Sequence, residues 1–128
     1  KRPYLSHTFM LHDRKTNTSK VNSSIYEEVF DILKTFCSKN KIKLNKCFRA
    51  NLNITFPLKT KTGKFHKDHK FEHRQLIVYL NNSDGDTVLK KDGRIKFKKY
   101  RGACFDDQLH YAETPSKNRR AILIFTFI

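Results

Sequence analysis

The stretch FHKDHKFEHRQLIVYL, residues Phe65–Leu80, places a cluster of metal-binding side chains directly before an apolar run. The cluster consists of His66, Asp68, His69, Glu72 and His73. The run QLIVYL is short, apolar and rich in β-branched residues, which predicts a buried strand over residues 75–80. Because side chains at i and i+2 of an extended segment point to the same side, His66 and Asp68 can reach a single ion.

Upstream of this stretch, apolar and polar residues alternate over residues 47–55, which predicts a strand with one polar face. If that face lines a cavity, Arg49, Asn51 and Asn53 point into it; otherwise it faces solvent. Before it, Ser24 and Glu27 match a capping box, so we expect a helix over residues 24–39. Its apolar stripe is predicted to consist of Ile25, Val29, Ile32, Leu33 and Phe36. We expect a short strand over residues 6–11 and a loop over residues 13–22.

Downstream, short apolar segments are separated by turn residues. NNSDGD (residues 81–86) is a turn, and strands are predicted over residues 87–89, 95–99, 102–105 and 121–128. Many short strands after one helix favour a mainly β (α+β) sandwich or barrel over a βαβ fold. The 128-residue length fits one domain over 1–128, with the helix about 24–39 and a β core about 47–128.

A third metal ligand has to come from elsewhere in the chain, and His110 is the best candidate because it follows the predicted strand GACF. Two histidines and one carboxylate leave coordination positions open, which is typical of non-haem Fe(II) oxygenases. Arg119 lies nine residues after His110 and opens the apolar run AILIFTFI. Arg120 would point to the opposite face of that strand, and because both faces are apolar, alternation does not choose between the two arginines.

Two segments carry a resemblance to a known family. FHKDHKFEHRQLIVYLNNSDGDTVL and RGACFDDQLHYAETPSKNRRAILIFTF resemble the double-stranded β-helix (jelly-roll) core of Fe(II)- and 2-oxoglutarate-dependent dioxygenases. The likeness is to the prolyl-hydroxylase-like branch, including its small phage-encoded relatives, and it covers about residues 48–128. It implies an oxidoreductase that uses Fe(II), 2-oxoglutarate and O2, with ascorbate as an accessory reductant.

The resemblance also implies roles for individual residues. His66, Asp68 and His110 would bind Fe(II), and Arg119 would pair with the distal carboxylate of 2-oxoglutarate, with family spacing favouring it over Arg120. Tyr79, in the sequence Tyr79-Leu80-Asn81, would donate a hydrogen bond to the same carboxylate. Peptidyl proline is the substrate that the family suggests, while a free amino acid, another protein side chain and nucleic acid stay open.

Two other functions use the same residues. His69, Glu72 and His73 spell H-x-x-E-H, which on a helix would form a zinc hydrolase site. A strand follows this segment at once, which argues against a helix, so we expect His69 and His73 at the rim, where His73 could meet substrate. Alternatively, the net charge of +15 suits a nucleic-acid-binding jelly roll without catalysis.

Composition bears on location. Cys37, Cys47 and Cys104 form no CxxC pair, which indicates free thiols in a reducing compartment. The N-terminal sequence shows no secretory signal, and no apolar run reaches membrane length, so a cytoplasmic protein without a membrane partner is predicted.

Overall fold

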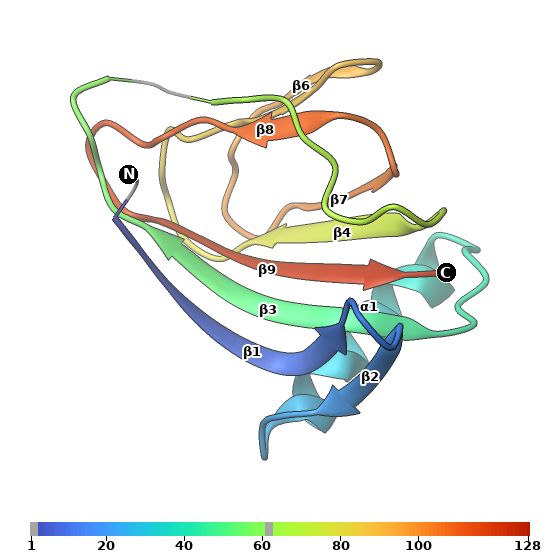
Figure 1. Cartoon of the computed structure of the whole chain (residues 1–128). Helices are drawn as coiled ribbons and strands as arrows, with labels where there is room; N and C mark the ends of the chain where they lie inside the picture. Colours follow the sequence, from blue (N-terminus) through green and yellow to red (C-terminus); the bar gives the residue numbers. More distant parts are fainter. Residues whose placement is uncertain (1–2, 61–62) are drawn as a thin grey trace.

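Two antiparallel β-sheets face one another, and a single helix covers the outer side of the larger one (Figure 1). The computed structural model describes residues 3–60 and 63–128. The larger sheet has the order β2-β1-β3-β9-β4-β7 and the smaller one β6-β5-β8. The elements are β1 (Tyr4–Asp13), β2 (Thr18–Val21), α1 (Tyr26–Lys39), β3 (Cys47–Thr55), β4 (Arg74–Tyr79), β5 (Thr87–Leu89), β6 (Gly93–Ile95), β7 (Gly102–Asp106), β8 (His110–Ala112) and β9 (Arg120–Phe127).

The predicted helix is confirmed, but its start and its buried face differ from the prediction. Helix α1 begins after Ile25, which makes no side-chain capping bond, so the capping box of Ser24 and Glu27 does not form. Ile25 and Ile32 are exposed, whereas the buried side chains are Tyr26, Val29, Leu33 and Cys37. The stripe of side chains that packs on the sheet therefore begins at Tyr26, one residue after the expected Ile25. In the described part of the chain, no helix is long and apolar enough to span a membrane.

Residues 47–55 and 87–89 match β3 and β5, and four other predicted strands are present with ends shifted by one or two residues. The strand predicted over residues 95–99 is wrong, because β6 is Gly93–Ile95. Two strands were not foreseen. Strand β2 occupies part of the predicted loop over residues 13–22, where it pairs with the end of β1 in a hairpin. Strand β8 is only His110–Ala112 and pairs with β5. Strands β2 and β8 are both short and half polar. They are extended because they pair with a neighbouring strand, and their own residue pattern does not predict a strand.

Alternation along β4 and β9 builds two separate cores. Leu76, Leu123 and Phe125 pack with α1 in the outer core. Ile77, Tyr79, Ile122 and Ile124 belong to the core between the sheets. Even-numbered residues of β9 and odd-numbered residues of β4 therefore face the smaller sheet. This parity decides which polar side chains of these strands reach the space between the sheets.

The α1 side of the molecule offers a matched stability test. Leu33 is 0% exposed, and Leu33→Ala is expected to lower the free energy of unfolding by about 2–5 kcal/mol because it leaves a cavity under the helix. Ile32 is 40% exposed, and Ile32→Ala should cost less than about 1 kcal/mol. Urea denaturation of both variants measures the difference, and equal losses would contradict the observed orientation of the helix.

Candidate metal centre

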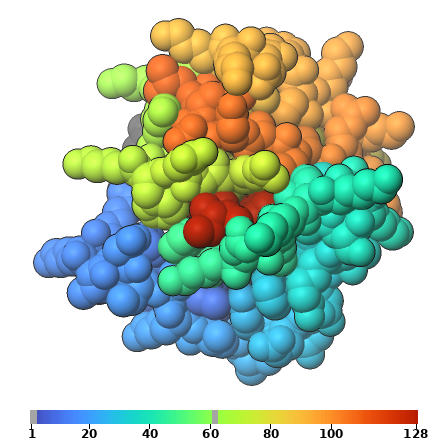
Figure 2. Space-filling view, turned by 90° about the vertical axis from the view of Figure 1, so that its right-hand side faces the viewer, coloured from blue at the N-terminus to red at the C-terminus, as the bar shows by residue number. Residues whose placement is uncertain are grey.

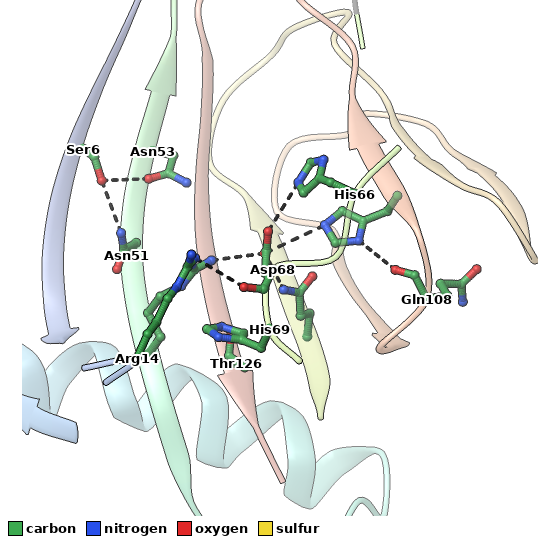
Figure 3. A network of polar contacts seen from close by, with 12 residues as sticks. Ser6, Arg14, Asn51, Asn53, His66, Asp68, His69, Gln108 and Thr126 are labelled. Carbon is green, nitrogen blue, oxygen red and sulfur yellow. Dashed lines mark hydrogen bonds and ion pairs between the residues drawn. The ribbon is translucent and has the colours of Figure 1, made fainter. Parts of the chain in front are cut away.

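His66, Asp68 and His110 meet at one end of the space between the two sheets. Their ligand atoms lie within 4.8 Å of one another, and within residues 3–60 and 63–128 they are the one such group of three. His66 and His110 exchange two backbone hydrogen bonds of 3.0 Å, which fixes the segment before β4 against the start of β8. Asp68 follows two residues after His66 and completes the group (Figure 3).

Backbone carbonyls orient both imidazoles. Nδ1 of His66 lies 2.9 Å from the carbonyl oxygen of Lys64, and Nδ1 of His110 lies 3.0 Å from that of Gln108. Because a carbonyl can only accept, each Nδ1 donates to it, and Nε2 is the ring nitrogen left to face a metal. These Nε2 atoms face Asp68 at 3.3 Å (His66) and 3.8 Å (His110), the arrangement found for metal-binding histidines.

Asp68 is held in its charged form by its neighbours. Arg49 and Gln75 donate hydrogen bonds to Oδ2 at 3.2 and 2.5 Å, while Oδ1 faces His66. Burial alone would raise the pKa of Asp68, but Arg49, Gln75 and the two histidines outweigh it and lower that pKa below its usual value. One carboxylate oxygen is thus anchored and the other is directed at the histidines.

His110 is prepared as a neutral ligand. Burial lowers its pKa from the usual value, more than the Gln108 carbonyl and Asp68 raise it. A neutral imidazole is the form that binds a metal, so protons compete weakly at this position. Two imidazole nitrogens and one carboxylate oxygen, with further positions open, fit a divalent ion such as Fe(II).

A cavity of about 400 Å³ extends from this group between the sheets. Besides the three candidate ligands it is lined by two arginines, Arg49 from β3 and Arg120 from β9. Nε of Arg49 is buried, and in the described part of the chain it has no hydrogen-bond partner. A small dianion with two carboxylates would satisfy the cationic groups of such a cavity. The residues present therefore fit 2-oxoglutarate as well as a metal.

Arg120, rather than Arg119, points into the cavity, and this corrects the prediction. Arg119 lies before β9 and is exposed, whereas Arg120 is 2% exposed and has the same parity as Ile122 and Ile124. Its guanidinium is held by two donated hydrogen bonds, from Nε to the Gly85 carbonyl at 2.8 Å and from Nη2 to Oγ1 of Thr87 at 2.9 Å.

Tyr79 supports Arg120 instead of lining the cavity. It is fully buried, and its hydroxyl lies 2.8 Å from Oγ1 of Thr87, the atom that also accepts from Arg120. The guanidinium lies 5.8 Å from the centre of the Tyr79 ring. Gly85 permits this packing, because a Cβ there would be 2.8 Å from Cδ of Arg120. Tyr79 is not among the residues that line the cavity, so this geometry gives no support to its predicted hydrogen bond to a co-substrate.

The remaining candidates lie apart from the cavity. Asn51 binds Ser6 through its amide nitrogen and does not line the cavity, whereas Asn53 on the same face of β3 does. His69 and His73 are 7% and 3% exposed, so the prediction that they lie at the rim is wrong. Burial, followed by Arg49, lowers the pKa of His69 to about 4.

The positions of His69, Glu72 and His73 do not form the site that the zinc hydrolase alternative requires. Residues 69–73 form no helix, and Glu72 is exposed while His69 and His73 are buried. Nε2 of His69 is occupied by the Thr126 hydroxyl at 3.2 Å, and Nδ1 of His73 by the Phe71 carbonyl at 2.7 Å. The carboxylate is therefore not placed to activate a water held by the two histidines.

Two residues of the site were missed from the sequence, Gln75 and Thr87, and a third, Arg120, was named only as the rival of Arg119. Gln75 is a polar residue at the start of an apolar strand and is 0% exposed, which was a signal for a buried partner. Thr87 carried no such signal, because threonine is common in strands. Arg120 was considered but could not be separated from Arg119 by alternation.

Comparison with known proteins bears on the fold. No protein-family model and no curated protein matches the sequence. Among solved structures, the chain is similar to an oxidoreductase of the 2OG-Fe(II) oxygenase family from Burkholderia pseudomallei, with a TM-score of 0.71 and 12% identity over 97% of this chain and 68% of that chain. It is also similar to the viral collagen prolyl hydroxylase of Paramecium bursaria Chlorella virus-1 (TM-score 0.60, 16% identity, 95% and 72% covered). A Pseudomonas putida prolyl-4-hydroxylase gives a TM-score of 0.59 with 12% identity over 98% and 72% of the two chains.

These likenesses establish the fold and leave the activity to be argued from the site. The chain has the double-stranded β-helix core that the sequence predicted, with its helix outside the larger sheet.

Proposed function

We propose that this protein is an Fe(II)- and 2-oxoglutarate-dependent oxygenase that hydroxylates a C–H bond of its substrate. The observation that carries the proposal is the common cavity: His66, Asp68 and His110 share about 400 Å³ with Arg120, a buried arginine on the neighbouring strand. A metal triad alone occurs in many proteins, and so does a buried arginine. Together in one cavity they match the needs of a metal ion and an anionic co-substrate.

Each residue has a defined task in this proposal. His66, Asp68 and His110 would hold the metal, and Arg120 would bind a carboxylate of the co-substrate. Arg49 and Gln75 keep Asp68 ionised and turned toward the histidines. When bound, Fe(II) and 2-oxoglutarate would allow O2 to act as the oxidant, with one oxygen atom entering the substrate C–H bond and the other entering the succinate that forms together with carbon dioxide.

The chain also supplies the environment that such chemistry requires. The inner wall of the cavity includes the apolar side chains Ile77, Ile122 and Ile124, which make that side of the cavity unfavourable for water. Tyr79 and Thr87 hold Arg120 in place before any ligand arrives, so little reorganisation is needed on binding.

The direct test is spectroscopic and needs no substrate. Anaerobic addition of Fe(II) and 2-oxoglutarate together is expected to produce a visible charge-transfer absorption that neither produces alone, and admission of air should then yield succinate. Zn(II) in place of Fe(II) serves as the control, because it occupies the same ligands without redox chemistry. Metal binding without any such absorption would contradict the proposed co-substrate.

A further inference from the structure

A second cavity, of about 820 Å³, opens beside the metal centre between the β1–β2 hairpin and the segment that precedes β4. Figure 2 shows the blue hairpin and the yellow-green segment meeting on one face of the molecule. Arg14 of the hairpin joins the two by donating a hydrogen bond to the Asp68 carbonyl at 3.3 Å. Asp68 lines both cavities, so the second cavity lies against the candidate metal ligand.

Positive charge dominates the wall of this cavity, which we call the basic cavity. Arg14, Lys67 and Lys70 line it and are exposed. Among its described lining residues the one acid is Asp68, whose carboxylate is engaged by Arg49 and Gln75. Asp13, the neighbour of Arg14, does not line it, and its carboxylate accepts from the backbone amides of the hairpin turn. Three cations, one from the hairpin and two from the segment before β4, thus lack a matching set of anions within the cavity.

Aromatic rings form the rest of the wall. His12, His69 and Phe71 all line the basic cavity, and their ring centres lie 5.0–5.5 Å apart. Phe48 packs against Phe71 from the protein side at 4.8 Å. A wall of cations interleaved with aromatic rings is the combination that binds single-stranded nucleic acid, because phosphates meet the cations and bases meet the rings.

We propose that the basic cavity binds a single-stranded nucleic acid and that this strand is the substrate of the neighbouring metal centre; the substrate assignment rests on the proposed function. The net charge of +15 supports a polyanionic partner over a neutral one. An acidic peptide would satisfy the cations but would leave the aromatic wall without planar partners.

We infer a single strand because two of the three candidate ligands are recessed. The side chains of Asp68 and His110 are 14% and 8% exposed and line the cavity between the sheets, whereas that of His66 is 53% exposed. A target atom within a paired duplex cannot approach such ligands, whereas an unpaired nucleotide can enter while its neighbours stay in the basic cavity.

Binding of a fluorescein-labelled single-stranded DNA of mixed sequence, followed by fluorescence anisotropy, tests the first part. Arg14→Ala/Lys67→Ala/Lys70→Ala is expected to weaken binding about 10- to 100-fold and to lower the slope of log affinity against log salt by about 2, at ~0.7 per lost phosphate contact. The matched control is Lys39→Ala/Lys43→Ala/Lys98→Ala, which removes the same charge from exposed positions outside both cavities. Equal weakening by the two triple variants, or equal affinity for duplex DNA, would overturn the proposal.

Succinate formation tests the second part. The single strand is expected to stimulate the conversion of 2-oxoglutarate by the wild-type protein severalfold, while a glutamate-rich peptide and a proline-rich peptide should not. Stimulation by either peptide instead of the strand, or binding of the strand without stimulation, overturns its role as substrate. Absence of succinate under all conditions, together with strand binding that depends on the three cations, would refute the oxygenase function and leave the binding site standing.

Discussion

Asp68→Ala is expected to abolish turnover and to weaken Fe(II) binding by more than about 100-fold. Loss of a group that merely supports a metal ligand typically costs 10- to 100-fold in affinity, and Asp68 would be the one carboxylate ligand of the group. Its removal leaves two imidazoles and no carboxylate beside the guanidinium of Arg49, which then repels the metal. Titration with Co(II), followed by its visible absorption, measures the affinity directly.

The variant also leaves Arg49 without its partner, and the side chain of Arg49 is only 20% exposed. Asp68→Ala/Arg49→Met removes both charges and separates loss of metal binding from loss of folding, which circular dichroism monitors. Asp31→Ala on the exposed side of α1 is the control for a general change in charge. If Asp68→Ala bound Co(II) as tightly as the wild type, the proposed metal centre would be wrong.

Arg120→Lys is expected to raise the KM for 2-oxoglutarate about 10- to 100-fold, with a smaller effect on metal affinity. Lysine keeps the charge but loses the planar fork that matches a carboxylate, and a charge-assisted bond of this kind is worth about 1.5–3 kcal/mol. Loss of that free energy weakens the binding of 2-oxoglutarate at least tenfold. Initial rates of succinate formation at varied 2-oxoglutarate provide the measurement.

Arg119→Lys is the matched control, because Arg119 is adjacent in sequence and exposed. Its KM should stay within about twofold of the wild type. The reverse result, with Arg119→Lys impaired and Arg120→Lys unaffected, would restore the original prediction and contradict the orientation of β9. Thermal melting of both variants tests whether loss of the bonds from Arg120 to Gly85 and Thr87 disturbs the fold instead.

Local pattern was sufficient for several features of this protein. Period-two alternation located β3, short apolar runs located β4 and β9, and helical spacing located α1. The apolar runs reflect strands that are buried on both faces. The H-x-D spacing and a distant histidine selected His66, Asp68 and His110, which the fold brings within 4.8 Å. Strands β2 and β8 escaped prediction because they are short and are stabilised by pairing with β1 and β5.

What the sequence by itself determined was therefore the set of candidate side chains and the strands that carry them. What only the tertiary structure decided was which of them share a cavity. Arg119 and Arg120 are chemically equivalent neighbours ahead of an apolar run with two apolar faces, and one face of β9 packs on α1 while the other packs between the sheets. A sequence shows the alternation of side chains along a strand, but not which face of the strand packs on which layer. The packing of distant segments therefore decided three features: the choice of Arg120, the anchoring of Asp68 by Gln75, and the basic cavity beside them.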